Sequence, residues 1–344
     1  MSYYSVKRKN RKTAKKRAVI AVVLIMSIAI LMGAAGIIFI NVTLNRVNRA
    51  EKIKPIPRSE QDFETDGEGE DTISPEEVSW GKPDMSVIND KDIKNILLIG
   101  QDRREGQGRQ RSDTMIICSI NRRIKKITLV SLMRDMYVPI TGYDDNRINA
   151  TYAFGGMELL DQTIERNFGV HIDGNVEVDF EGFIKTMSQV GDLELMLTQE
   201  EADFINNKLK RGTLKSGKNK MDAEQILLYA RIRKIGNGDY QRTERQRIVL
   251  QTAFAQLRQY DWWTIYSFTK AVLPNFTTDM TNRQIIGYVF NVFTSKMMIN
   301  RDTYRLPIDG SYHAERIRGM DVLVPDLNEN AKTLKWYLYG INKQ

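Results

Sequence analysis

The chain has 344 residues, and 42% of them are hydrophobic, which is enough for one sizeable buried core. The formal net charge of +8 equals the charge of the first 17 residues alone, which hold eight Lys or Arg and no acid, so the remainder is formally neutral. A basic tail by itself is also typical of a nucleic-acid arm. The neutral remainder argues against a nucleic-acid-binding surface on the folded part, and we expect no nucleic-acid partner.

Several classes of site are excluded by residue type. The only cysteine is Cys118, so no intramolecular disulfide can form. The two histidines, His171 and His313, stand in no metal-ligand spacing, which argues against zinc and against acid–base catalysis by histidine. No Gly-x-Ser-x-Gly, Walker A or Cys/His nucleophile pattern occurs.

Residues 18–42 form an uncharged apolar run directly after the basic tail. As a helix this run would measure about 37 Å at ~1.5 Å per residue, enough to cross a bilayer core of ~30 Å. The cations before it predict a cytoplasmic tail over residues 1–17. A cleaved signal peptide is the alternative, but Ile-Ile-Phe-Ile continues beyond the small residues 33–36. The sequence therefore predicts a single-pass signal anchor in the cell membrane, with its C-terminal part extracytoplasmic.

Residues 43–90 differ in composition from the rest of the chain. They are dense in acid over residues 60–71 and are punctuated by Pro55, Pro57, Pro75 and Pro83. Low hydrophobicity combined with high charge does not support a core. We therefore expect a flexible acidic stalk over residues 43–90 and one folded domain over residues 91–344.

Three short runs rich in Ile, Leu and Val, residues 95–100, 114–120 and 127–132, open the domain and are typical of strands. A short polar turn joins the second run to the third, so the three strands should run up, down and up. One edge of the sheet should then carry a charged set: Asp102, Arg111, Asp113, Arg134 and Asp135. Two carboxylates suit Mg²⁺, which also accepts phosphate oxygens, and arginines suit phosphate. A surface ion-pair network is the alternative.

The middle of the chain alternates between the two periodicities. Helical spacing marks residues 157–168, 183–190 and 199–209, the last opened by the capping box Thr198–Glu201, and strand patterns mark 175–180 and 192–197. Further helices are expected over residues 261–276, 278–293 and 326–338, and further strands over 303–307 and 321–324. An opening meander followed by this alternation predicts an α/β fold, a single domain with a mixed central β-sheet flanked by helices.

Residues 221–258 form the second charged stretch. A helix capped by Asp222 ends at Arg231 and Arg233, a glycine-bearing loop follows, and the next helix opens with Arg242, Arg245 and Gln246. Arginines near a helix N-terminus meet its positive partial charge, so their clustering there favours a bound anion. The pattern therefore indicates an anion clamp, with a solvated charged face as the alternative.

Six ordered motifs stand out along the chain: Leu-Ile-Gly-Gln-Asp102, Arg111-Ser-Asp-Thr-Met, Ser131-Leu-Met-Arg-Asp, the run from Arg147 to Gly156, Tyr229-Ala-Arg-Ile-Arg and Asp239-Tyr-Gln-Arg-Thr-Glu-Arg-Gln. Together they resemble the LytR-CpsA-Psr family of bacterial cell-envelope proteins. Two positions depart from the usual family pattern: Met133 stands where proline is common, and Gly191-Asp192 stands where two glycines are usual.

The resemblance implies a magnesium-dependent phosphotransferase. Such an enzyme moves a glycopolymer, usually wall teichoic acid or capsular polysaccharide, from a polyprenyl-pyrophosphate carrier to a peptidoglycan sugar hydroxyl. It implies Asp102 and Asp113 as metal ligands, and these two with Arg134 and Arg231 as catalytic residues. The pyrophosphate-binding residues it implies are Arg111, Arg134, Arg231, Arg233, Arg242, Arg245 and Gln246. The general base stays open between Asp135 and Asp239. A polyprenyl-pyrophosphate hydrolase and a non-catalytic regulator that binds such a lipid remain alternatives.

Overall fold

The computed structural model describes residues 41–81, 86–102, 109–294, 297–300 and 302–340. The predicted basic tail, and the predicted membrane helix except for its last two residues, lie outside these ranges. Within the described residues, no helix is both long and apolar enough to cross a membrane. Residues 1–46 and 47–344 separate into two compact units, and the strands and the helices α2 to α9 belong to the second.

A mixed sheet forms the centre of this second unit, as the sequence predicts. Its strands lie in the order β1-β10-β7-β2-β3-β4-β11, with β12 also paired to β4. The antiparallel meander is β2 (Ile93–Gln101), β3 (Ser112–Asn121) and β4 (Lys126–Leu132). The other strands are β1 (Asn48–Arg49), β7 (Gly174–Asp179), β10 (Thr277–Thr278), β11 (Met298–Ile299) and β12 (Tyr304–Leu306). The end of β2, the start of β3 and the end of β4 therefore share one edge.

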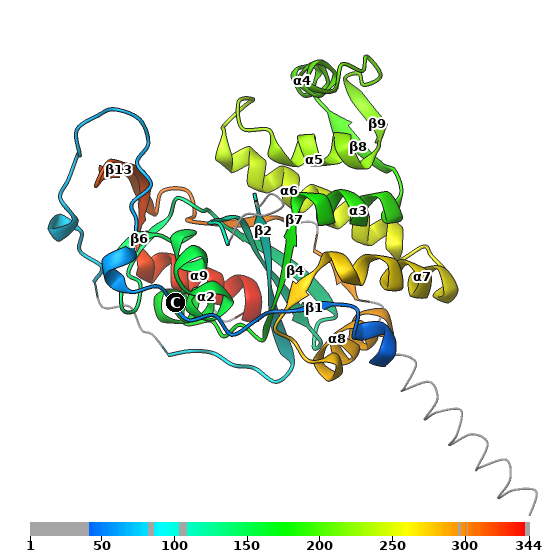
Figure 1. Ribbon diagram of the computed structural model, residues 1–344, viewed down its shortest axis with the longest axis horizontal. Coiled ribbons are helices and arrows are strands. Elements are labelled where there is room, and N and C mark those ends of the chain that lie inside the picture. The colour runs from blue at the N-terminus through cyan, green and yellow to red at the C-terminus, as the bar shows by residue number, and fades with distance from the viewer. Residues whose placement is uncertain (1–40, 82–85, 103–108, 295–296, 301, 341–344) are drawn as a thin grey trace, which may run out of the picture. The chain divides into compact units, whose positions relative to one another are not determined.

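Helices cover both faces of the sheet (Figure 1). On one face, Leu97, Met115 and Val130 belong to a core shared with α2 (Ala150–Phe168) and α9 (Leu327–Tyr339). On the other face, Ile96, Ile116 and Leu129 meet α6 (Asp239–Leu257) and α8 (Asn282–Thr294). Because both faces are covered, the central strands carry nearly continuous apolar runs.

A second apolar cluster lies beside the sheet. Three helices and a hairpin contribute to this cluster together with α6: α3 (Phe180–Val190), α4 (Gln199–Leu209), α5 (Ala223–Arg231) and the pair of strands β8 (Leu193–Leu197) and β9 (Gly217–Met221). The helix α7 (Trp262–Val272) packs on α3. Both predicted capping boxes form: the Thr198 hydroxyl accepts from the Glu201 amide at 3.2 Å, and Asp222 accepts from the Gln225 amide at 3.0 Å. These caps fix where α4 and α5 begin.

Some elements differ from the sequence-based prediction. The helix α2 begins at Ala150, before the two glycines, and is kinked at Gly156, which has a φ of 67°. The sequence predicts only the second strand of the hairpin formed by β13 (Tyr312–Ile317) and β14 (Met320–Pro325). Short pieces complete the described fold: β5 (Tyr137–Val138), β6 (Asn146–Arg147) and the 3-10 turns η1 (Arg58–Glu60), η2 (Pro75–Glu77) and η3 (Leu273–Asn275).

The predicted stalk is the clearest difference. From Val47 onward the chain belongs to the folded unit, and β1 joins the central sheet. Phe63, Ile73, Val78 and Trp80 pack around buried Tyr137 and the β13–β14 hairpin. The expectation of a flexible spacer therefore does not hold for residues 47–81, because scattered apolar side chains and matched charges dock this acidic segment on the domain.

Candidate functional site

The charged edge of the sheet brings together residues from four places in the sequence. Asp102 directly follows β2, Asp113 is the second residue of β3, and Arg134 lies two residues beyond β4. Arg231 ends α5 and Asp239 begins α6. The meander places the first three at one edge, as predicted, and the α5–α6 connection adds the second charged stretch to it.

Arg134 is the centre of the ion-pair network. Its Nη1 lies 2.7 Å from Oδ1 of Asp113, and its Nε lies 3.2 Å from Oδ2 of Asp239 and 3.3 Å from Oδ1 of Asp135. Burial lowers the pKa of Arg134, but the three neighbouring carboxylates outweigh that effect and raise it above its ordinary value. This guanidinium is therefore a fixed cation that holds three carboxylates together.

Arg233 and Arg242 approach the same carboxylates from the α5–α6 connection. Arg233 lies 3.4 Å from Asp113 and 3.5 Å from Asp239, and Arg242 lies 3.4 Å from Asp239. The Arg242 side chain is only 3% exposed, and its Nε has no hydrogen-bond partner among the described residues. Burial, together with repulsion by Arg233 and Arg134, lowers the pKa of Arg242 to about 10 although Asp239 opposes this, so it stays protonated at neutral pH. A buried cation with a free donor is what an anion site requires.

Arg231 and Gln246 complete the cluster. Arg231 lies 3.4 Å from Asp102, and its guanidinium stacks 3.9 Å above the ring centroid of Phe180. Gln246 donates from Nε2 to the Thr114 hydroxyl at 2.9 Å, one residue from Asp113. The structure thus gathers six of the residues that the resemblance implied for the site or its metal, besides Gln246: Asp102, Asp113, Arg134, Arg231, Arg233 and Arg242.

Asp135 and Asp239 are neighbouring carboxyls in this cluster, and both contact Nε of Arg134. Burial raises the pKa of Asp135 to about 6; Arg134 opposes the rise and Asp239 adds to it. Burial also acts to raise the pKa of Asp239, but the surrounding arginines outweigh it and lower that pKa below its usual range. The two carboxyls therefore differ in charge near pH 6, a distinction that the sequence alone does not reveal.

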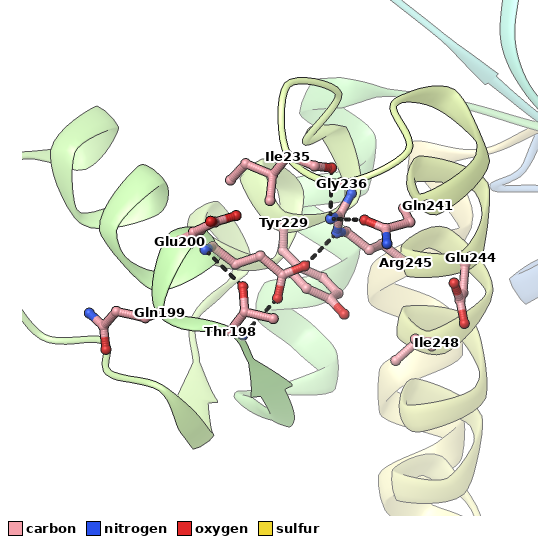
Figure 2. A pocket seen from close by; sticks show the side chains of 11 residues that line it. Thr198, Gln199, Glu200, Tyr229, Ile235, Gly236, Gln241, Glu244, Arg245 and Ile248 are labelled. Atoms are coloured by element: carbon pink, nitrogen blue, oxygen red, sulfur yellow. Dashed lines mark hydrogen bonds and ion pairs between the residues drawn. The ribbon is translucent and has the colours of Figure 1, made fainter.

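Arg245 does not join the cluster, contrary to the sequence-based prediction. It points from α6 toward α4, where its Nε lies 2.7 Å from Oε1 of Glu201 and its other nitrogens donate to Gln241 and to backbone carbonyls (Figure 2). Glu201 and Arg245 are both nearly buried in the wall of a cavity of about 610 Å³ between α4 and α6. Arg245 stands three residues from Arg242, but its ion pair with buried Glu201 gives it a structural role within the domain.

Arg111 stands at the same edge of the sheet, but its ion pairs are with residues outside the network of Arg134. Its Nη2 is 2.9 Å from Oδ2 of Asp62 and its Nε is 3.5 Å from Oε2 of Glu64, both in the segment predicted to be a stalk. Glu64 also pairs with Arg147, a buried residue that lies 3.7 Å from Asp135. Sequence reasoning missed Arg147 as part of the site, although it opens the motif that runs to Gly156.

The edge of the sheet offers a magnesium ion two carboxylates, Asp102 and Asp113. The described residues contain no group of three or more His, Cys, Asp or Glu side chains able to hold a metal. Asp102 and Asp113 are two carboxylates at the ends of neighbouring strands, and each also accepts a long 3.4 Å contact from an arginine. Mg²⁺ commonly binds through one or two carboxylates and takes waters and phosphate oxygens as its other ligands, so this pair fits that ion.

Comparison with known proteins identifies the family. The sequence matches the profile of the LytR_cpsA_psr family over residues 56–335. The chain belongs to this family. That match begins within the segment predicted to be a stalk, which agrees with its docking on the domain. The resemblance drawn from the motifs is thereby confirmed.

Individual members of the LytR_cpsA_psr family share part of the sequence. Regulatory protein MsrR of Staphylococcus aureus is 35% identical over 166 residues, 48% of this chain and 49% of MsrR. TagU of Enterococcus faecalis, named a polyisoprenyl-teichoic acid–peptidoglycan teichoic acid transferase, is 35% identical over 217 residues, 60% of this chain and 68% of TagU. The chain thus spans about half the length of MsrR.

The fold is shared as well. The structure of TagT with bound octaprenyl pyrophosphate superposes with a TM-score of 0.55 at 22% identity, covering 75% of this chain and 93% of that one. TagT is a Bacillus subtilis protein. At this identity the likeness establishes the α/β fold with its mixed sheet.

Proposed function

We propose that this protein transfers a glycopolymer from a polyprenyl-pyrophosphate carrier to a sugar hydroxyl of peptidoglycan, forming a phosphodiester. The observation that carries the proposal is the buried guanidinium of Arg242, whose Nε has no hydrogen-bond partner among the described residues, beside Arg134 and Arg233. Planar guanidinium groups bind phosphate oxygens in pairs, and three of them gathered together match a pyrophosphate better than a single carboxylate.

The proposed lipid part of the donor has a matching surface below the arginines. Along α6, positions 242, 246, 250 and 254 share one face, so this face changes from charged to apolar with distance from the site. Between this helix, the sheet and α8, several apolar side chains are only half-buried: Leu98, Cys118, Val176, Leu250, Phe254, Ile285 and Val292. A charged head above an apolar strip fits an amphiphile with a pyrophosphate head and a prenyl tail. The TagT structure holds octaprenyl pyrophosphate, a lipid of this class.

The chemistry we assign to the chain's own residues is a displacement at phosphorus. The acceptor hydroxyl oxygen attacks the phosphorus that carries the sugar, and the bond from that phosphorus to the bridging oxygen breaks. Polyprenyl phosphate leaves, and Arg231, Arg233 and Arg242 stabilise the charge that develops on it. Asp135 takes the hydroxyl proton, because a carboxyl with a pKa of about 6 is ionised at neutral pH and is a better base than Asp239.

Magnesium forms part of the proposal. Asp102 and Asp113 would hold it, and when bound it would neutralise negative charge on the pyrophosphate. Carboxylates engaged in that way would release Arg231 and Arg233 from their 3.4 Å contacts. These two arginines are the most exposed of the cluster, at 45% and 42%, so they are free to turn toward a substrate.

The proposed function also implies a location at the outer face of the cell membrane. The apolar run over residues 18–42 would anchor the chain in the membrane, with the domain on the outer side where peptidoglycan lies. The name of TagU, a teichoic acid transferase, supports a wall polymer as cargo. MsrR is named a regulatory protein, which keeps a lipid-binding regulator as the second candidate.

The experiment uses the full chain in detergent with a synthetic polyprenyl-pyrophosphate disaccharide, peptidoglycan fragments and MgCl₂, followed by mass spectrometry. We expect a sugar phosphate joined to the glycan by a phosphodiester. Asp102→Asn and Asp113→Asn should each lower the transfer rate about 100-fold or more, because each removes charge from the metal side of the site. Asp203→Asn is the matched control, since Asp203 is an exposed aspartate on α4 bonded only to Gln199 in the described contacts.

Other outcomes separate the rival functions. Free sugar phosphate without a conjugate would establish a hydrolase, and intact lipid bound without reaction would establish the regulator. Full transfer by both aspartate variants would remove the metal assignment while leaving the arginine site in place.

A further inference from the structure

The acidic segment over residues 60–71, here called the acidic strap, is fixed to the domain by its own contacts. The Asp66 amide donates to the Gly319 carbonyl at 2.8 Å, and the Asp71 carboxylate accepts from the amides of Arg318 and Gly319 at 2.8 and 2.7 Å. Phe63 packs among the side chains of the β13–β14 hairpin. The strap is therefore held in place by contacts that do not involve Arg111.

The strap presents its anions to Arg111. The carboxylate of Asp62 lies 2.9 Å from Nη2 of Arg111, and the backbone carbonyl of Asp62 accepts from the same nitrogen at 3.1 Å. Glu64 lies 3.5 Å from Nε. The Arg111 side chain is 12% exposed, whereas that of Asp62 is 64% exposed, and Nη1 of Arg111 has no hydrogen-bond partner among the described residues. The anion in this contact is solvated and replaceable, while the cation is largely enclosed.

We propose that the acidic strap is an internal competitor for the anion site, which the incoming pyrophosphate must displace from Arg111. This inference rests on the proposed function, because the displacing anion is the pyrophosphate of the donor. Arg111 is two residues from Asp113, so it belongs to the same edge of the sheet as the cluster around Arg134. The Asp62 carboxylate of this ion pair is exposed to water, which weakens the contact, so a multiply charged ligand can displace that carboxylate at small cost.

Asp62 and Glu64, the two strap acids that contact Arg111, differ in their other partners. Glu64 and Asp66 pair with Arg147 at 3.0 and 2.8 Å, and the Arg147 side chain is only 3% exposed, so these two carboxylates compensate a buried charge. Asp62 forms no ion pair with Arg147 among the described contacts, and its carboxylate engages Arg111. Asp62 is therefore the residue whose neutralisation tests the competition without disturbing the core.

The test measures binding of inorganic pyrophosphate to the full chain in detergent by calorimetry, in MgCl₂. Asp62→Asn should bind pyrophosphate about two- to five-fold more tightly than the wild type, which corresponds to an exposed ion pair of ordinary strength. Glu68→Gln removes the same charge from the same strap, but Glu68 is exposed and forms no ion pair with a described residue, so its affinity should match the wild type.

A double-mutant cycle separates local competition from a general change of charge. In an Arg111→Gln background the gain from Asp62→Asn should vanish, because the competed cation is gone. An unchanged or weaker affinity in Asp62→Asn, or a gain that persists without Arg111, would overturn the inference. Absence of pyrophosphate binding by the wild type would instead count against the proposed function. An unfolding temperature within about 2 °C of the wild type checks that each variant is folded.

Discussion

At the scale of single residues, the arginines of the edge cluster divide into two kinds. Arg134 makes a 2.7 Å contact with Asp113 and touches two further carboxylates, so it is held on several sides. Arg231 and Arg233 make contacts of 3.4 to 3.5 Å and are nearly half exposed. The first kind keeps the carboxylates in place, and the second can exchange a carboxylate for a phosphate with little rearrangement.

Asp135 gives the site a pH dependence with a definite sign. If it accepts the hydroxyl proton, it must be ionised, so the transfer rate should fall as the pH drops through about 6 and lose roughly ten-fold per unit below that. Asp135→Asn should lower the rate at neutral pH and abolish this acid limb. The measurement is a rate profile between pH 5 and pH 8 for both proteins.

Stability provides the control for that profile. The pKa of Asp135 in the folded protein lies above its ordinary value, so its proton stabilises the fold at low pH and this contribution is lost as the pH rises through about 6. Asp135→Asn should therefore not lower the unfolding temperature at pH 7.5. A variant that keeps the wild-type acid limb would show that another group titrates.

At the scale of elements, local signals in the sequence proved sufficient for much of the fold. Three apolar runs with a short turn predict the meander β2–β3–β4. Capping residues that stand three positions apart predict where α4 and α5 begin. The meander also brings Asp102, Asp113 and Arg134 to one edge of the sheet. These predictions succeeded because each depends on residues that lie close together in the sequence.

Other features depend on partners that are distant in the sequence. Arg245 and Arg242 have the same local signature, and only Glu201, 44 positions away, assigns Arg245 to packing. The two-residue strands β1 and β10 are defined by their pairing with each other and with β7, since two residues show no periodicity. The kink of α2 could not be predicted from the sequence either, because Gly155 and Gly156 are equally compatible with a turn between two separate elements.

Gly156 tests the importance of that kink. Its φ of 67° and ψ of −153° lie in a region that residues with a side chain rarely adopt, and a Cβ there would meet Nη1 of Arg109 at 2.9 Å. Gly156→Ala should lower the free energy of unfolding by about 1–3 kcal/mol. Gly287→Ala is the control, because Gly287 lies inside α8 with open space around its Cβ, and alanine there should stabilise by about 0.5–1 kcal/mol. Chemical denaturation of both variants gives the comparison, and equal effects would remove the special role of Gly156.

At the scale of the whole molecule, the charges of residues 47–81 and of the later domain are complementary. Composition alone predicted a spacer, because low hydrophobicity combined with high charge does not support a core. The counter-ions are Arg111 and Arg147, which come later in the sequence, and Trp80 stacks on buried Tyr137 with ring centroids 5.9 Å apart. Residues 47–81 are thus part of the domain that they were expected only to tether.

Removal of this segment should therefore destabilise the domain. A fragment that begins at residue 82 leaves Arg147 without Glu64 and Asp66 and with only the 3.7 Å contact to Asp135, and loss of the partners of a buried charge costs about 3–5 kcal/mol. It also uncovers the ring of Tyr137. We expect its unfolding temperature to be roughly 10 °C or more below that of a fragment beginning at residue 47. Arg147→Met should recover part of the difference in the shorter fragment while lowering the stability of the longer one. Equal unfolding temperatures for the two fragments would mean that the segment adds nothing to the fold, and the acidic strap would then have no fixed position from which to compete.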